Sequence, residues 1–595
     1  MNFHPHELPF QLYSVLGAEA LTARPRFSDH SRATFDAAIA SAERIAMERF
    51  ATHYRKSDLN EPRLENGSVR LIPEIGEAVR AFSKAGFMAA AFDYELGGMQ
   101  LPWVITQACY IHFHAANVAT FAYCFLTTAA ANLLSIYGSQ QQKDRYLTDM
   151  LSGKFLGTMC LSESQAGSSL ADITTKAKPI GNGLYRIVGD KMWISAGEHD
   201  IADNIVHLVL AKIEGAPAGV GGISLFIVPR ARATDRGIEH NNISLVGLNH
   251  KMGYRGTTNT ALRFGEFGDC IGELVGQPHY GLKYMFHMMN EARITVGLSA
   301  VGVASSAYRV SLDYALSRRQ GRHADAKDPS LPQVPIAEHP DVRRLLLEQK
   351  AYVEGALALG LYCAWLVDEA KTAADDARRQ NADILLGILT PIMKAWATQW
   401  CLHANDHAIQ VLGGAGYTRD FPVEQLYRDN RLNPIHEGTN GIQAIDLLGR
   451  KVAANNGEAV QLLQSAMAAD AEIALRHDRT REFGAALHEA ITTIGRTTES
   501  MLSLRRASGQ GRYLANASAY LEIVGRVVVA WMWLRQANAA NTHLGDIDTP
   551  AAGFYAGKLH AARYFFRWKL PEIGHLAKLA SENDDTFVAM NEAWL

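Results

Sequence analysis

The segment YRIVGDKMWIS, residues 185–195, decides the fold, because β-branched and aromatic residues alternate in it with polar ones. Three further short runs follow, separated by Gly, Asn, Asp and Pro residues. Alternation with a period of two is typical of antiparallel strands, since successive side chains point to opposite faces of a sheet. We therefore predict a middle antiparallel β-domain over residues 157–278; the further runs are NIVHLVLAKI (204–213), ISLFIVPR (223–230) and NTALRF (259–264).

Helical patterns lie on both sides of this β-domain, with apolar residues at spacings of three and four. They include PEIGEAVRAFSKAG (73–86), with Pro73 near its start and Gly86 past its end, a helix that runs from near Asn132 to Gly153, and a helical C-terminal part with a break around residues 539–552. Strands do not alternate with helices along the chain, which argues against a doubly wound parallel sheet and its dinucleotide site. The expected fold is α+β and mostly α. Around the β-domain we predict an N-terminal extension (1–35), an N-terminal helical domain (36–156), a four-helix bundle (279–455) and an additional C-terminal helical domain (456–595).

The composition is that of an ordinary globular protein, and it restricts the choice of partners and compartment. The 595 residues exceed what one hydrophobic core holds. A net charge of −3 provides no global attraction to nucleic acid or to an anionic membrane. The six cysteines form no CxxC pair and no spacing typical of a metal or disulfide site, so we expect no metal and a reducing, cytoplasmic location.

One long apolar stretch requires a decision about membranes. Residues 101–141 contain no Lys, Arg, Asp or Glu, and a membrane span needs about 20 predominantly apolar residues. The stretch is, however, interrupted by Gln, His, Asn and Thr residues. We interpret it as two buried core helices and expect no membrane span. The N-terminus lacks the basic and apolar regions of a secretory signal.

The most informative segment for chemistry is RDNRLNPIHEGTNGIQAIDLLGRK, residues 428–451. On its own, Glu437 could be a helix N-terminal acid beside a Thr cap, favoured by the helix dipole. The segment nevertheless resembles the active-site segment of acyl-CoA dehydrogenases, in which an aromatic or His residue precedes Glu-Gly-Thr. The resemblance implies that Glu437 is the base that removes the α-proton of a thioester. Burial would raise the pKa of such a carboxyl toward the range that suits a general base.

Two further motifs resemble the flavin-binding stretches of the same family. In GTMCLSESQAGSSLADI (157–173), Ser164 and Ser169 replace the usual Pro and Asp. The resemblance implies that this motif lines the isoalloxazine ring (Met159, Leu161, Ser162) and meets the flavin phosphate (Gly167, Ser168), with Ser168 also near the CoA moiety. In GDKMWISAGEHD (189–200), Trp193 would flank the flavin and Ser195 would bond near its reactive edge, although a Trp in a strand is more often core.

The remaining motifs resemble the elements that hold the rest of the cofactor and the substrate. GGAG, within residues 408–429, follows a helical pattern and not a strand, so a Rossmann interpretation fails. The resemblance assigns the FAD pyrophosphate and adenosine of a neighbouring subunit to Arg318, Gln320, Gln410, Gly413 and Gly414, and further cofactor contacts to Thr439 and Gly441. Asn290 and Arg293 would border the acyl-CoA channel, with Gly438 close to substrate; a solvated helix face is the alternative for the first two.

The implied activity is FAD-dependent α,β-dehydrogenation of an acyl-CoA to a trans-2-enoyl-CoA, with hydride transfer to flavin N5. An electron-transfer flavoprotein is the implied acceptor, and a homodimer or larger the implied assembly. The extra 140 or so residues resemble the long bacterial branch that includes 3-methylmercaptopropionyl-CoA dehydrogenase and larger fatty acyl-CoA dehydrogenases. Two alternatives stay open: an acyl-CoA oxidase, and a flavoprotein that binds nucleic acid through the locally basic segment 560–570.

Overall fold

The computed structural model describes residues 3–326, 328, 330–544 and 551–595, and it divides into two compact units. Unit 1 comprises residues 1–34, 102–111 and 293–595, and unit 2 comprises residues 35–101 and 112–292. The long helices α5 (Trp103–Tyr137) and α8 (Gly281–Ser317) each contribute residues to both units.

Unit 2 contains an eight-stranded sheet with the order β10-β11-β5-β12-β7-β6-β3, in which β4 pairs with both β5 and β6. Most neighbours are antiparallel, as predicted, but β3–β6 and β4–β6 are parallel. Parallel pairing needs a long connection, and intervening chain supplies it between β3 and β6. The strands are β3 (Phe155–Cys160), β4 (Lys176–Gly181), β5 (Leu184–Ser195), β6 (Asn204–Ile213), β7 (Ile223–Pro229), β10 (Ile243–Leu248), β11 (Asn259–Phe264) and β12 (Ile271–Leu274).

The centre of this sheet is buried on both faces, which explains the nearly continuous apolar run in β6. Leu208 and Leu210 join a cluster with Leu134 of α5, whereas Val209 and Ala211 join a second cluster on the opposite face. Successive side chains of a strand face opposite sides of a sheet, so both sets are buried at once. Unit 2 also contains two separate two-stranded sheets, β1–β2 (Arg63–Glu65, Ser68–Arg70) and β8–β9 (Ala231–Thr234, Gly237–His240).

The helices of unit 2 begin and end at residues that favour helix termini. Helix α4 (Pro73–Lys84) begins at a proline and ends just before Gly86, whose φ of +83° is the left-handed conformation that glycine adopts readily. The helix expected up to residue 153 instead breaks after α5, because Ser139 and Gln142 form a capping box for a new start. Shorter helices are α2 (Arg32–Ile45), α3 (Tyr54–Leu59), α6 (Gln140–Gln142) and α7 (Thr148–Leu151).

Helix α5 covers the uncharged stretch and consists of two helical parts. Asn117 leaves helical geometry (φ −165°, ψ 87°); its side chain donates to the Phe50 carbonyl and accepts from the Thr120 amide. Among the described residues, three helices are long and apolar enough to cross a membrane by length and composition alone: α5, α9 (Pro340–Thr372) and α15 (Ala517–His543). In their most apolar stretches 56%, 94% and 83% of the residues are buried within the chain, so packing accounts for much of their apolar character.

Within its described residues, the regular elements of unit 1 are all helices, joined by loops. Its central helices are α9 (Pro340–Thr372) and α10 (Asp376–Leu412), which pack along each other, with α11 (Val423–Asn430) and α12 (Asn440–Asp446) against α10. Asp375 caps α10 by accepting from the Arg378 amide at 2.7 Å. These helices, with the C-terminal part of α8, form the part of unit 1 that carries Glu437.

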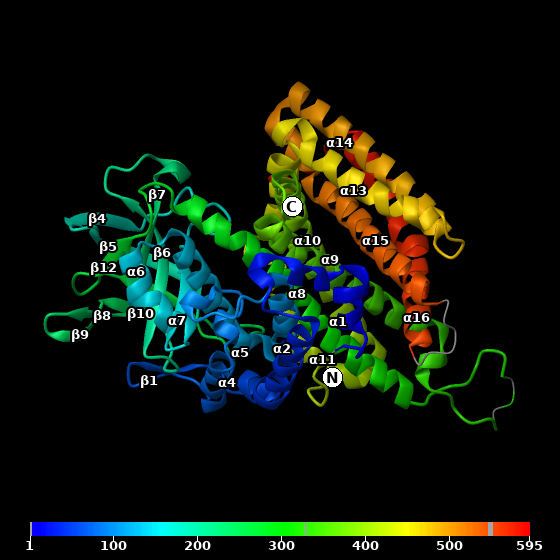
Figure 1. Cartoon of the computed structure of the whole chain (residues 1–595), viewed down its shortest axis with the longest axis horizontal. Coiled ribbons are helices and arrows are strands. Elements are labelled where there is room, and N and C mark those ends of the chain that lie inside the picture. The colour runs from blue at the N-terminus through cyan, green and yellow to red at the C-terminus, as the bar shows by residue number, and fades with distance from the viewer. Residues whose placement is uncertain (1–2, 327, 329, 545–550) are drawn as a thin grey trace. The chain divides into compact units, whose positions relative to one another are not determined.

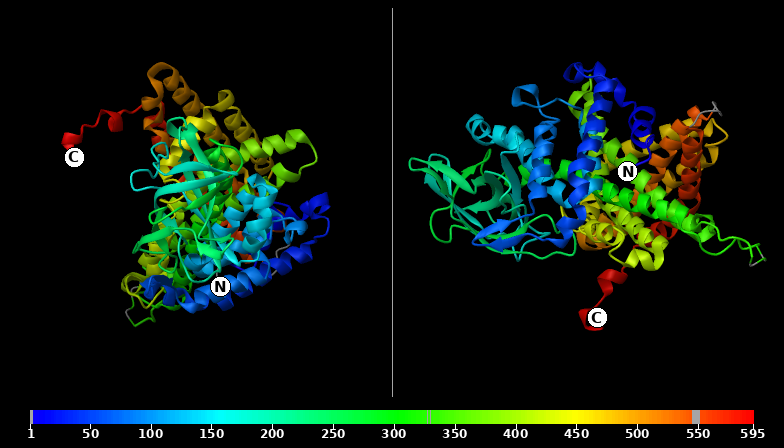
Figure 2. Two further views of the ribbon diagram at one scale, coloured as in Figure 1. Left: turned by 90° about the vertical axis from the view of Figure 1, so that its left-hand side faces the viewer. Right: turned by 90° about the horizontal axis from the view of Figure 1, so that it is seen from below.

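Additional helices complete unit 1. Helices α13 (Glu458–Leu475), α14 (Arg481–Ala515) and α15 (Ala517–His543) run side by side, and α15 also contacts α9 (Figure 1). α16 (Ala552–Tyr564) and α17 (Ile573–Ser581) pack on α15. The break expected around residues 539–552 falls partly on 545–550, outside the described residues. After α17 the chain extends away from these helices, through α18 (Thr586–Ala589), as both views of Figure 2 show.

A buried ion cluster ties the N-terminal segment, with α1 (Glu7–Pro9), to the additional helices. Lys558 of α16 is fully buried, and its Nζ donates to Glu7 at 2.6 Å, to Glu354 of α9 at 2.8 Å and to Gln536 of α15 at 3.0 Å. Lys350 also pairs with Glu354. Four segments that are distant in sequence therefore meet at one charge.

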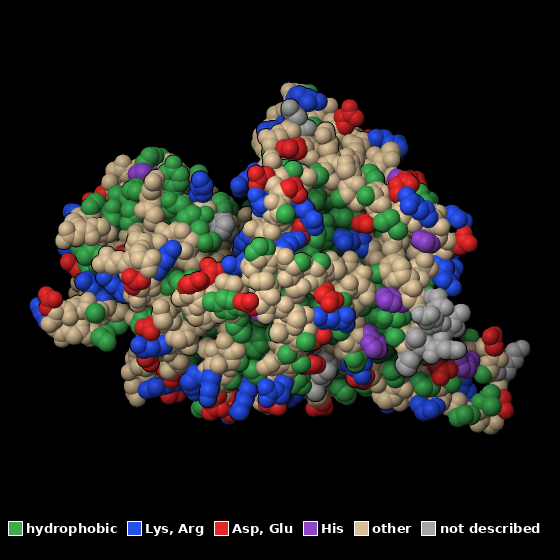
Figure 3. Space-filling model, in the orientation of Figure 1, with side chains coloured by type: hydrophobic (Ala, Val, Ile, Leu, Met, Phe, Trp, Pro, Cys, Tyr) green, Lys and Arg blue, Asp and Glu red, His purple; other side chains and the backbone are tan. Residues whose placement is uncertain are grey.

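The described surface mixes charges of both signs. On the face shown in Figure 3, Lys and Arg side chains lie among Asp and Glu side chains. Within the locally basic segment 560–570, Arg567 pairs with Glu482 at 2.6 Å and Lys569 pairs with Glu348 at 2.5 Å. These two basic charges already have carboxylate partners in the folded chain, which weakens the case for nucleic-acid binding there.

Candidate active site

Glu437 lies on a tight turn between α11 and α12 in unit 1. Its φ is +54° and that of Gly438 is +86°, so two successive residues adopt the left-handed conformation, which costs a non-glycine residue energy. The Gln443 side-chain amide donates to the Glu437 carbonyl at 3.1 Å and to the Gly438 carbonyl at 3.3 Å. These bonds fix the turn, and with it the position of the Glu437 side chain.

The helix cap beside Glu437 is Thr439. Its hydroxyl accepts from the Ile442 amide at 3.4 Å and begins α12, in which Gly441 is exposed. Glu437 therefore precedes the cap by two residues and does not lie in the first helical turn. A role as a mere helix N-terminal acid does not explain a carboxylate in this strained position.

The Glu437 carboxyl has an unusual electrostatic environment. Burial raises its pKa, while the positive charges of Arg293 and Lys394 act in the opposite direction. Lys394 on α10 is itself buried, and burial lowers its pKa to about 7 although Glu437 opposes that shift. A carboxyl whose pKa is raised and whose ionised form is nonetheless supported by nearby cations suits a general base.

Arg293, predicted to border the substrate channel, is buried with 3% of its surface exposed. Its Nη1 donates to Asp446 of α12 at 3.0 Å. The alternative of a solvated helix face therefore does not hold for Arg293. Asn290 lies one helical turn earlier on α8 and is partly exposed.

A chain of side-chain amides ends on His436, the residue before Glu437. Asn430 Nδ2 donates to the Ala300 carbonyl at 3.2 Å and to Asn405 Oδ1 at 2.6 Å, which fixes the orientation of its amide. Asn433 Nδ2 donates to Asn430 Oδ1 at 2.8 Å, and Asn433 Oδ1 faces His436 Nε2 at 3.0 Å. His436 Nε2 must then be the protonated nitrogen. Burial lowers the pKa of His436 to about 3, so the ring is neutral.

The first flavin-like motif lies in unit 2, on β3 and the loop that follows it. Its ring-lining candidates Met159, Leu161 and Ser162 are partly exposed, and Gly167 and Ser168 are exposed. The second motif runs beside it, because the Met192 amide of β5 donates to the Ser162 carbonyl at 2.9 Å. The two motifs thus meet, although some 30 residues separate them in sequence.

A buried ion pair holds these two motifs together. Lys191 Nζ donates to the Leu161 carbonyl at 3.0 Å and to Glu163 at 2.9 Å, and both side chains are almost fully buried. The Glu163 carboxylate also accepts from the backbone and hydroxyls of Thr174 and Thr175. Burial alone would raise the pKa of Glu163, but Lys191 and these hydrogen bonds lower it to about 2.

Replacing Lys191 by Met should therefore destabilise unit 2 without unfolding it. Glu163 would lose its cation but keep the hydrogen bonds from the two threonines, so we expect a loss of about 2 kcal/mol, the value of a hydrogen bond to a charged group. The measurement is the unfolding midpoint in urea. The control is Asp190→Asn. Asp190 is the neighbour of Lys191 on β5, and its substitution breaks only an exposed ion pair with Arg263 of β11. Equal midpoints for the two variants would contradict the expectation.

Trp193, one of the two flavin-facing candidates on β5, is not a core residue. Its side chain is 60% exposed, and its backbone has a φ of +63° inside a strand. An exposed large aromatic residue in a strained conformation indicates a contact surface. Ser195 is two residues further along, and its hydroxyl accepts from Asn259 at 3.3 Å.

The predicted pyrophosphate and adenosine contacts are all exposed in unit 1. Arg318 and Gln320 follow the C-terminal end of α8, and the group Gln410, Gly413 and Gly414 lies at the C-terminal end of α10. The C-terminal part of α8 contacts the loop that follows the glycine turn, because Tyr314 and Phe421 have ring centres 5.6 Å apart. An atom added at the Cβ position of Gly413 or Gly414 would meet nothing within 4 Å, so the backbone there is open to a ligand.

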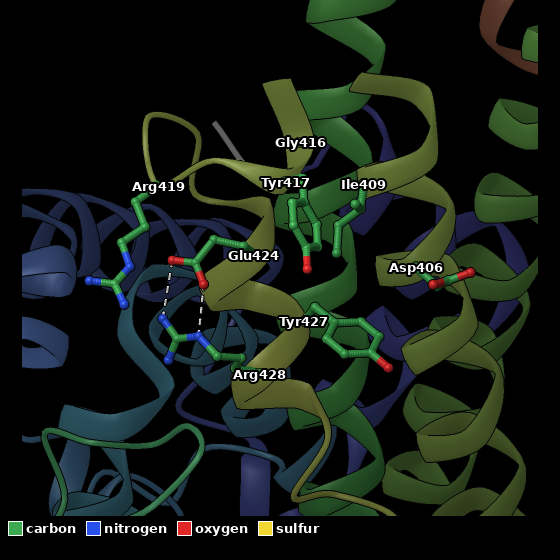
Figure 4. A pocket seen from close by; sticks show the side chains of 8 residues that line it. All are labelled: Asp406, Ile409, Gly416, Tyr417, Arg419, Glu424, Tyr427 and Arg428. Atoms are coloured by element: carbon green, nitrogen blue, oxygen red, sulfur yellow. Dashed lines mark hydrogen bonds and ion pairs between the residues drawn. The ribbon is translucent and has the colours of Figure 1, made fainter. Parts of the chain in front are cut away.

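A pocket of about 420 Å³ adjoins this glycine turn (Figure 4). The side chains of Tyr417 and Tyr427 line it together with Ile409. Glu424 and Arg428 pair across its other side, with Nε–Oε2 and Nη2–Oε1 distances of 2.7 and 3.1 Å. The glycine turn therefore borders a concave surface with aromatic walls.

Comparison with known proteins agrees with this arrangement. Four family models match consecutive parts of the chain: the acyl-CoA dehydrogenase N-terminal domain (36–154), middle domain (158–267) and C-terminal domain (279–452), and the acetyl-CoA dehydrogenase C-terminal-like domain (459–591). The last of these models matches the additional C-terminal helices, the part of the chain for which the sequence resembled the long bacterial branch of the family.

Individual relatives extend over nearly the whole chain. The 3-methylmercaptopropionyl-CoA dehydrogenase of Ruegeria pomeroyi is 36% identical and covers 90% of both chains. The broad-specificity linear acyl-CoA dehydrogenase FadE5 of Mycobacterium tuberculosis is 31% identical and covers 98% of both. The solved acyl-CoA dehydrogenase of Bacillus anthracis, complexed with FAD, shares the fold with a TM-score of 0.75 at 18% identity, over 98% of this chain and 93% of that one. This chain belongs to the acyl-CoA dehydrogenase family.

Proposed function

We propose that this enzyme catalyses the FAD-dependent α,β-dehydrogenation of an acyl-CoA thioester to a trans-2-enoyl-CoA, with Glu437 as the base. The observation that carries the proposal is the Glu437 carboxyl, whose pKa is raised by burial and which a hydrogen-bonded left-handed turn holds in place. The family membership and the dehydrogenase relatives support the reaction class.

The residues of the two flavin-like motifs fit a flavin. The partly exposed edge formed by Leu161 and Ser162 and the exposed Trp193 provide surfaces of the kind that a flavin ring contacts. Elsewhere in the chain, the backbone-open Gly413 and Gly414 offer N–H groups to the dinucleotide part of the FAD of a second subunit. FAD, when bound, supplies the acceptor for the hydride that leaves the β-carbon. Arg318 is a suitable partner for a pyrophosphate, because a guanidinium binds phosphate oxygens through several donors.

The work of the polypeptide is to remove and hold one proton. Glu437 takes the α-proton onto its carboxylate, so the C–H electron pair remains on the substrate and forms the new double bond as the β-hydride leaves. The Glu437 backbone N–H is the proposed donor to the thioester carbonyl, where negative charge develops. Desolvation in this partly buried position raises the pKa of the carboxyl and makes it a stronger base than a solvated glutamate.

The test is anaerobic mixing of the purified yellow holoenzyme with a panel of acyl-CoAs. The panel includes short and long linear chains and 3-methylmercaptopropionyl-CoA, the compounds after which the two relatives are named. We expect saturable bleaching of the flavin by at least one member, with one enoyl-CoA formed per flavin. Failure of every thioester to bleach a fully loaded flavin would remove the proposed reaction.

The proposed electron acceptor is an electron-transfer flavoprotein, as in dehydrogenases rather than oxidases. Re-oxidation of the bleached enzyme distinguishes the two. A dehydrogenase should pass its electrons rapidly to the flavoprotein and slowly to oxygen, whereas stoichiometric hydrogen peroxide in air would identify an acyl-CoA oxidase instead.

We also propose a homodimer or larger assembly in which the exposed group Arg318, Gln320, Gln410, Gly413 and Gly414 meets the FAD of a second subunit. Its supports are the exposure of these residues and the concave surface beside Tyr417. Light scattering that found a monomer with a full complement of FAD would rule out this part of the proposal.

A further inference from the structure

Lys394 is a buried lysine that none of the motifs includes. It lies in the middle of α10, in the run IMKAWAT, with no measurable exposure of its side chain. Lysine is almost never fully buried unless its ammonium group has a partner, because desolvation of the charge is costly. The partner here is the Asn440 side chain, whose Oδ1 accepts from Lys394 Nζ at 3.2 Å.

Asn440 lies three residues after Glu437, at the first position of α12. Both its side-chain amide and its backbone amide form hydrogen bonds. Its Nδ2 donates to the Ala395 carbonyl at 3.2 Å, which orients the amide so that Oδ1 faces Lys394. Thr398, one turn along α10, also donates to Oδ1 at 3.2 Å. The Asn440 backbone amide donates to the Pro434 carbonyl at 3.1 Å. One face of α10 thus holds the end of the catalytic turn.

The charges around this contact come from three elements. Glu437 and the neutral His436 lie on the turn, Arg293 comes from α8, and Asp446 of α12 neutralises Arg293 at 3.0 Å. Lys394, in contrast, is hydrogen-bonded to an uncharged amide. Its positive charge therefore acts on the Glu437 carboxylate without a carboxylate partner of its own, in addition to the larger influence of Arg293.

We propose that Lys394 is a positioning residue of the reaction, which holds the Glu437 turn through Asn440 and keeps a positive charge beside the catalytic carboxylate. The inference rests on the assignment of Glu437 as the base. It extends that assignment by naming a group that, together with Arg293, lowers the pH at which the base becomes ionised.

The experiment compares Lys394→Met with Lys451→Met by the rate of anaerobic flavin bleaching as a function of pH. Lys451, on the π-helical turn after α12, is the control, because it is a nearby, partly buried lysine whose charge faces Asp446 and Arg450. Loss of the Lys394 charge makes Glu437 harder to ionise. We expect the acid limb of the profile to move to higher pH by about one unit, with the acyl-CoA concentration for half-saturation little changed. Lys451→Met should keep the wild-type limb.

Two further substitutions separate charge from tethering and guard against misfolding. Lys394→Gln keeps a hydrogen-bond donor for Asn440 but no charge, so it should fold and show the same upward shift. Lys394→Arg keeps the charge and should restore the limb toward wild type. A wild-type limb in Lys394→Gln would overturn the proposal. Failure of the base assignment is distinguishable, because it would appear as normal bleaching by Glu437→Gln whatever Lys394 does.

Discussion

Glu437→Gln should bind FAD and acyl-CoA normally but bleach its flavin about 10²–10⁴-fold more slowly than wild type, the range that general-base catalysis contributes. Glutamine has the shape of glutamate and keeps the left-handed turn, whose bonds from Gln443 go to backbone carbonyls and do not involve the side chain. It cannot accept the α-proton. The rate is measured by anaerobic stopped-flow absorbance with a saturating acyl-CoA.

Glu458→Gln is the control for this prediction. Glu458 is an exposed acid in the first turn of α13 and bonds to Asn455, so its loss should leave the bleaching rate unchanged. Bleaching by Glu437→Gln at the Glu458→Gln rate would mean that another group removes the proton.

Lys558→Met should produce the largest loss of stability. The substitution leaves Glu7 and Glu354 buried without the ammonium that bonds to both, and Lys350 can compensate at Glu354 alone. Removing one partner of a buried ion pair costs about 3–5 kcal/mol, because an uncompensated charge remains. The measurement is thermal unfolding followed by circular dichroism, in which the first transition should fall in temperature.

The site of Lys558 also predicts where the damage appears. The cluster holds the N-terminal segment against α9 and α15, so limited proteolysis should release the first residues of the variant before it attacks the sheet of unit 2. Arg567→Met, which breaks an exposed pair with Glu482, should change neither measurement. A Lys558→Met protein as stable as Arg567→Met would contradict the role given to the cluster.

Much of the fold followed from local patterns in the sequence. The four short runs rich in β-branched and aromatic residues became β5, β6, β7 and β11, and the glycine and proline signals marked the ends of α4 correctly. The parallel partners of β6 were not predicted, because strand pairing depends on contacts between segments and not on the period of either one. The break after α5 was also missed, although Ser139 and Gln142 formed a recognisable capping box.

The candidate site was predictable where one motif carries it. Glu437, Gly438 and Thr439 are consecutive, so a short resemblance finds them. Lys394 was missed because a single lysine in an apolar helix looks like a solvated side chain until the helix is shown to be buried. The amides of Asn430 and Asn433 did leave a signal, since polar residues recur at every third position up to His436.

The Lys558 cluster could not have been predicted in this way. Its members come from positions 7, 354, 536 and 558, and no local spacing relates them. The Glu163–Lys191 pair is an intermediate case, because both residues lie inside recognised motifs but their contact depends on the neighbouring positions of β3 and β5. Sequence patterns thus identified the elements, and packing decided which charges meet.

The most direct test of the central claim is exchange of the substrate α-hydrogens with solvent deuterium. An acyl-CoA with sulfur in place of the β-carbon can lose its α-proton but has no β-hydride to give, so proton removal is observed by itself. Mass spectrometry of this thioester after incubation with the holoenzyme in D₂O should show α-deuteration by wild type and by Glu458→Gln, and none above the enzyme-free rate by Glu437→Gln. Wild-type exchange in the Glu437→Gln protein would contradict the account.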